Sequence, residues 1–78
     1  LKKVIEIYQE LRDNANLVKL YPLAIKMDPK NAQFLAAQAV ALANVGQFKE
    51  ARVSAQKAIE LKPDFAKDIE AFLNSLPK

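Results

Sequence analysis

The sequence predicts an all-α fold of antiparallel helix pairs, with about five helices in one small domain of 78 residues. Apolar residues recur at helical spacing in every long segment, and the common residues Ala, Leu, Lys, Glu and Gln favour helices. One Gly, no Thr and no Trp argue against a sheet of many short strands. A chain of this length is close to the lower limit for independent stability.

The first expected helix covers residues 1–12, where apolar residues recur at steps of three and four. A cluster of short polar residues follows and indicates a turn with candidate helix N-caps. The apolar face of this helix consists of Leu1, Val4, Ile5, Tyr8 and Leu11, and the turn cluster of Asp13, Asn14 and Asn16.

The second expected helix covers residues 15–28 and contains Pro22. Proline lacks the backbone N–H and its ring clashes with the carbonyl four residues back, so we expect a kink or break near Leu20–Tyr21. Asp28-Pro29 ends the helix, because a residue before proline avoids helical dihedral angles.

Two further helices are expected at about 32–45 and 48–61, with Gly46 between them as a C-cap that can take the left-handed conformation. Asn31 is a candidate N-cap for the first, and Lys62-Pro63 ends the second. The last expected helix covers 65–76, and Pro77-Lys78 has the composition of a chain end. Its apolar stripe consists of Phe65, Ile69, Phe72, Leu73 and Leu76.

A repeat of 34 residues runs through the chain, as the spacing of Pro29 and Pro63 shows. The segments 24–29 and 58–63 have similar sequences, AIKMDP and AIELKP. With its helix–turn–helix pattern, the repeat resembles the tetratricopeptide repeat. Gln38 and Ala55 depart from that pattern, each in place of a larger apolar residue. The matching residues are Leu35, Ala39, Leu42, Gly46, Phe48, Ala51, Ala58 and Pro63.

The resemblance implies a single domain, with a degenerate repeat at 1–30, a well-formed repeat at 31–64 and a terminal capping helix at 65–78. Small Ala39 and Ala51 should let the helices of the well-formed repeat approach closely. Their counterparts Ile5 and Leu17 are larger, so we expect a looser first pair.

Ala55 leaves a hollow in the expected core, and Phe65 or Phe72 is expected to fill it because protein interiors tolerate few voids. On that basis Phe72→Ala should cost about 3–5 kcal/mol.

Catalytic and metal-binding residue types are scarce. The chain has no His and no Cys, and Ser54 and Ser75 have no candidate activating partner, so we expect no enzyme, no metal site and no cofactor. The net charge of +3 comes from scattered residues, which argues against a nucleic-acid partner. Residues 31–48 are uncharged but contain several amides, so we reject a membrane span.

The resemblance implies a protein–protein interaction scaffold whose concave groove binds a peptide or a helix. The first helix of each repeat lines that groove in the family. Burial between neighbouring helices is the alternative role for the same positions. Lys, Arg and Asn of family members that clamp a chaperone's carboxylate are replaced here by Ala36, Ala37 and Val40, which argues against that role. The predicted partner-binding residues are Gln33, Ala36, Ala37, Val40, Ala43 and Asn44.

The sequence also gives expectations for the oligomeric state, for the longer protein and for the cellular compartment. Fewer than two complete repeats imply further support from upstream repeats, from self-association or from exchange of an end helix between chains. For the isolated chain we expect a homodimer or a helix-swapped dimer. The chain begins at Leu1, not Met, and we expect it to belong to a longer sequence. An alternative function is the C-terminal accessory tail of a larger bacterial enzyme or of a membrane or secretion protein. A purely structural bundle is a third. The lack of Cys favours the cytoplasm.

Overall fold

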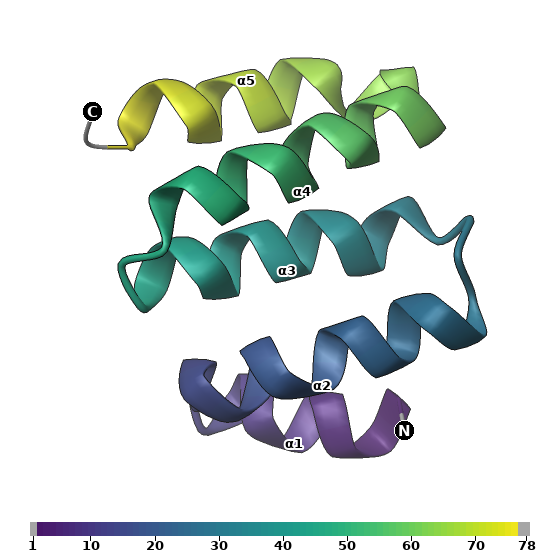
Figure 1. Ribbon diagram of the computed structural model, residues 1–78, viewed down its shortest axis with the longest axis vertical. Coiled ribbons are helices and arrows are strands. Elements are labelled where there is room, and N and C mark those ends of the chain that lie inside the picture. Colours follow the sequence, from purple (N-terminus) through teal and green to yellow (C-terminus); the bar gives the residue numbers. More distant parts are fainter. Residues whose placement is uncertain (1, 77–78) are drawn as a thin grey trace.

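In the computed structural model, which describes residues 2–76, five α-helices form a row in which each helix packs against the next (Figure 1). The prediction of an all-α fold with about five helices is confirmed. Leu1, expected in the first apolar stripe, and Pro77-Lys78, expected as a chain end, lie outside the described residues. The helices are α1 (Lys2–Glu10), α2 (Asn14–Met27), α3 (Ala32–Asn44), α4 (Phe48–Leu61), the 3-10 turn η1 (Pro63–Phe65) and α5 (Ala66–Ser75).

Side-chain caps begin α2 and α3 where the sequence places short polar residues. The Asp13 carboxylate accepts a hydrogen bond from the Asn16 backbone N–H at 3.3 Å. Asn31 Oδ1 accepts one from the Phe34 backbone N–H, also at 3.3 Å. Each cap satisfies one of the backbone donors that a helix leaves free in its first turn. The predicted N-cap at Asn31 is therefore confirmed.

Gly46 ends α3 in the left-handed conformation, with φ at +86°. Its N–H donates to the Ala43 carbonyl at 3.0 Å, and the next N–H, of Gln47, donates to the Leu42 carbonyl at 2.8 Å. This pair of bonds is the Schellman motif, which needs a residue with positive φ at this position. The predicted C-cap at Gly46 is confirmed.

A kink or a break was expected in the second helix, and the break is wrong, because α2 continues through Pro22 to Met27. The kink stays a prediction. Pro22 is exposed, so its ring points away from the core. On the opposite side, Leu17, Tyr21 and Ala24 are all buried. Burial of these side chains offsets the loss of one backbone hydrogen bond in the helix.

The last α-helix begins one residue later than predicted, because η1 precedes it. Pro63 occupies the first position of η1, where its missing N–H is not needed. The Phe65 N–H donates to the Lys62 carbonyl at 2.9 Å and closes this tighter turn. Phe65 therefore lies in the turn that leads into α5.

The core consists of two clusters of buried side chains, and α3 contributes to both. Ala41 joins the cluster at the α1–α2 end, and Leu35 and Ala39 join the cluster at the α4–α5 end. α3 is therefore the central helix of the row. The first cluster is Ile5, Leu17, Tyr21, Ala24 and Ala41, and the second is Leu35, Ala39, Ala55, Ala58 and Ile69.

α3 packs more extensively against α4 than α1 packs against α2. Ala39 and Ala51, the small residues of the α3–α4 pair, are fully buried. Their larger counterparts Ile5 and Leu17 are buried as well, and both belong to the first cluster. The arrangement agrees with a tight second pair and a less extensive first pair. The proposed division of the chain at residues 30 and 64 stays a prediction.

The last helix packs against the core cluster that contains Ala55, and the expected aromatic residues take part in that contact. Phe65 and Phe72 pack against the second cluster, and both are half-buried. Ile69 is the α5 residue that is buried within that cluster. Its position one turn before Phe72 places the smaller aliphatic side chain at the centre of the contact.

Candidate functional site

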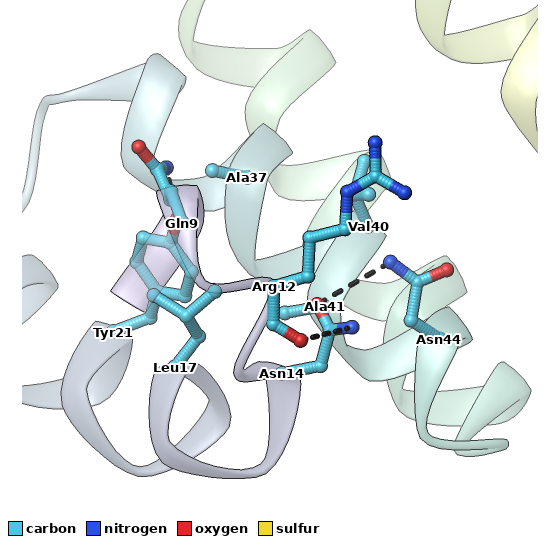
Figure 2. A pocket seen from close by; sticks show the side chains of 9 residues that line it. All are labelled: Gln9, Arg12, Asn14, Leu17, Tyr21, Ala37, Val40, Ala41 and Asn44. Atoms are coloured by element: carbon cyan, nitrogen blue, oxygen red, sulfur yellow. Dashed lines mark hydrogen bonds between the residues drawn. The ribbon is translucent and has the colours of Figure 1, made fainter. Parts of the chain in front are cut away.

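A cleft of about 450 Å³ lies between the α1–α2 pair and α3 (Figure 2). Its floor is apolar and buried, being formed by Leu17, Tyr21 and Ala41. Its rim is half-buried to exposed and mostly polar. The rim residues are Gln9 and Arg12 from the α1 end, Asn14 from α2, and Ala37, Val40 and Asn44 from α3.

Hydrogen bonds between elements hold the rim in place (Figure 2). The Asn44 side-chain amide donates to Asn14 Oδ1 at 3.3 Å and so connects α3 to the start of α2. At the other end, the Gln9 amide donates to the Tyr21 hydroxyl at 2.6 Å and connects α1 to α2. A partner would therefore meet a largely preformed surface, which lowers the entropy cost of binding.

Arg12 lies in the turn between α1 and α2 and has a φ of +56°, in the left-handed region. Its N–H donates to the Gln9 carbonyl at 3.1 Å, and the N–H of Asp13 donates to the Tyr8 carbonyl at 2.9 Å. The same Schellman pattern occurs at Gly46, which is 34 residues further along the chain. The first pair therefore keeps the turn of the second but has an arginine where glycine is favoured, at a cost of about 1 kcal/mol.

Arg12 is the charged side chain among the nine residues that line the cleft, and the rest are amides, one tyrosine and aliphatic groups. A single guanidinium beside apolar surface favours an anionic or hydrogen-bond-accepting group. Burial raises the pKa of Tyr21 above its usual 10.0, with a smaller opposing effect from the Gln9 hydrogen bond. Tyr21 is therefore a neutral phenol near pH 7, and its ring is part of the apolar floor.

The structure separates the six predicted partner-binding residues. Ala37, Val40 and Asn44 line the cleft. Gln33 lies at the other end of α3 and lines a second pocket of about 370 Å³ beside Lys62. The remaining two, Ala36 and Ala43, are half-buried, and Ala36 packs against the second core cluster.

The first helix pair also contributes to the cleft, through residues that were not predicted from the sequence, namely Gln9, Arg12 and Asn14. The sequence contains one signal for Arg12. The 34-residue period aligns it with Gly46, and so predicts a positive φ in the turn that follows the first helix. An arginine in such a turn is unusual enough to mark the position.

The comparison with protein families agrees with this architecture. Residues 20–53 match the model of the tetratricopeptide repeat. This chain contains a tetratricopeptide repeat. The match covers most of α2, all of α3 and the start of α4, so the repeat includes the α3 wall of the cleft. No curated protein and no solved structure matches the chain.

Tetratricopeptide repeats are generally non-catalytic modules for protein–protein interaction, and the present repeat has the fold for that role. In residues 2–76, no group of three or more acidic side chains is placed to hold a metal ion. Over the same residues, every helix is too short or too polar to cross a membrane.

Proposed function

We propose that this chain binds a peptide segment of a partner protein in the cleft between the α1–α2 pair and α3. The observation that carries the proposal is the combination of a buried apolar floor with a rim of amides and one guanidinium. Peptide sites commonly combine an apolar surface for an anchor side chain with a few polar groups that set orientation.

The chemistry of the rim defines the preferred peptide. Val40 is exposed beside the floor residues and offers contact to an aliphatic or aromatic anchor. Arg12 adds a positive charge at the rim, so the anchor should lie next to an acidic side chain. Asn44 can hydrogen-bond to the peptide backbone. The favoured ligand is therefore a short peptide with an apolar residue adjacent to Asp or Glu.

A displayed library of random peptides, selected on the purified chain, tests this function. The expected result is enrichment of sequences that place Asp or Glu beside a large apolar residue. Affinities of selected peptides are then measured by fluorescence polarisation. Val40→Glu introduces a charge that opposes an acidic ligand and should weaken binding at least about tenfold.

One substitution is the matched control and a second tests the guanidinium. Val53→Glu makes the same change at an exposed valine on α4, outside the cleft, and should leave affinity unchanged. Arg12→Gly keeps the turn and relieves its strain, so it should weaken acidic peptides while raising the stability of the fold. Equal loss of binding in Val40→Glu and Val53→Glu would contradict the proposal.

Two of the predicted residues, one outside the cleft and one on its rim, are compared directly. Gln33→Glu changes the end of α3 beside the second pocket, and Asn44→Glu changes the cleft rim. Binding in the cleft predicts a loss for Asn44→Glu and little change for Gln33→Glu. An accessory tail of a larger bacterial enzyme or of a membrane or secretion protein stays an alternative hypothesis, which the full-length sequence would test.

A further inference from the structure

The outer face of the α1–α2 pair carries exposed apolar side chains at the end of the helix row. On α1, Val4, Ile7 and Leu11 follow at steps of three and four, and Leu11 is 69% exposed. On α2, Leu23 and Met27 lie one turn apart, and Met27 is 77% exposed. Single exposed apolar residues are ordinary, but a stripe on adjacent helices marks an interaction surface.

The 34-residue repeat allows the exposure of Ile7 to be compared with that of the equivalent residue on α3. Ile7 corresponds to Ala41, which is only 2% exposed because it packs in the first core cluster with residues of α2. Ile7 is 55% exposed, since α1 lies at the end of the row and has α2 on one side only (Figure 1). In the repeat, this position of the helix is therefore one that another helix covers.

The surface extends from α1 onto α2. Leu20 packs against the cluster that contains Ile5, at the junction of the two helices. Leu23 and Met27 follow Leu20 at steps of three and four, so they continue its face outward from that junction. The outer face therefore consists of Val4, Ile7, Leu11, Leu23 and Met27.

We propose that the outer face binds a second copy of this chain, with the two α1 helices antiparallel about a two-fold axis near Ile7. The charged residues beside the apolar stripe support a second copy as the partner. Exposed Lys3 precedes Ile7 by four residues and exposed Glu10 follows it by three, so both lie along the same edge of the apolar stripe.

An antiparallel two-fold arrangement brings Lys3 of each copy opposite Glu10 of the other, and the pair occurs twice by symmetry. The opposite charges, one a helical turn before Ile7 and one about a turn after it, are thus self-complementary. α1 has nine residues, so its contact is short and the dimer is weak and depends on concentration. The outer face includes none of the residues that line the cleft.

Sedimentation equilibrium of the 78-residue chain tests the proposal, from about 1 µM to about 1 mM. The weight-average mass should rise from 8.7 kDa toward twice that value. Ile7→Glu should weaken association at least about tenfold, because it places a charge at the centre of the contact. Val53→Glu, at an α4 valine that is 54% exposed, is the matched control and should not change the mass.

Charge reversal tests the two-fold geometry. Lys3→Glu and Glu10→Lys should each weaken self-association about two- to fivefold. A mixture of the two variants should associate as well as the original chain, because each unlike pair is restored between copies. Circular dichroism checks that every variant keeps its helix content, and Leu11→Gln replaces Ile7→Glu if that variant loses helix.

Three outcomes would overturn the proposal. A mass of 8.7 kDa over the whole concentration range would exclude the second copy as the occupant of the outer face. Equal weakening by Ile7→Glu and Val53→Glu would place the contact elsewhere. If a mixture of the charge variants associates as weakly as either one alone, the antiparallel pairing of the α1 helices is excluded. A helix-swapped dimer without that pairing would give this result.

Discussion

The Ser54 hydroxyl on α4 donates a hydrogen bond of 2.9 Å to Gln38 Oε1 on α3 and links the two helices of the central pair. Gln38 occupies a place where the family pattern has a larger apolar residue. Ser54 is the buried polar side chain of the described residues, with 7% exposure. The departure at Gln38 is thus matched by a polar partner across the helix pair, and buried polar groups need such a partner.

Ser54→Ala should lower the free energy of unfolding by about 1–2 kcal/mol, because the Gln38 amide loses its partner in a partly buried position. Urea denaturation followed by circular dichroism measures the change. The double variant Ser54→Ala, Gln38→Met removes both polar groups and should recover most of the loss. A double variant as unstable as the single one would show that the cost comes from packing.

Tyr21 should make the fold less stable at alkaline pH. Burial raises the pKa of its phenol in the folded state above 10.0, since the phenolate is poorly solvated there. The unfolded chain therefore loses this proton first. The contribution to stability is complete below about pH 10 and is lost as pH rises through the folded-state pKa. Urea denaturation at increasing pH should show this decline.

Tyr21→Phe is the control for the alkaline effect, because it keeps the ring in the first core cluster and removes the titrating group. Gln9, which donates to the hydroxyl at 2.6 Å, is exposed and can bond to water instead. The variant should lose the part of the pH dependence that Tyr21 contributes. An unchanged slope in Tyr21→Phe would assign the alkaline loss to other groups.

Pro22→Ala should stabilise the protein by about 1–3 kcal/mol, because α2 runs through this position and alanine restores a backbone N–H to the helix. The greater freedom of alanine in the unfolded chain reduces the gain. Pro22 is exposed, so little packing is lost. Thermal and urea denaturation measure the effect. A less stable variant would mean that α2 is shaped around the proline.

Ile69→Ala should cost about 2–5 kcal/mol, since Ile69 is the buried α5 residue in the second core cluster. Phe72→Ala should cost less than Ile69→Ala and less than the sequence alone suggested, because Phe72 is half-buried. Parallel urea titrations of the two variants give the comparison. A larger loss for Phe72 would restore it as the principal contact of α5.

Part of the candidate cleft could be predicted from sequence. Helical spacing together with the family resemblance selects Ala37, Val40 and Asn44, which the structure places on the α3 wall. The other wall could not be found by the same route. Arg12 and Asn14 come from the turn between α1 and α2 and the start of α2, and their role depends on the packing of these helices against α3.

The sequence by itself determined the helices, the caps at Asn31 and Gly46, and the 34-residue repeat, because these depend on residues close together in the chain. The tertiary structure decided three other features. It kept α2 continuous through Pro22, placed Ile69 at the centre of the α5 contact, and left the outer face of α1 uncovered. Each of these results from packing between helices, where buried area outweighs local preference.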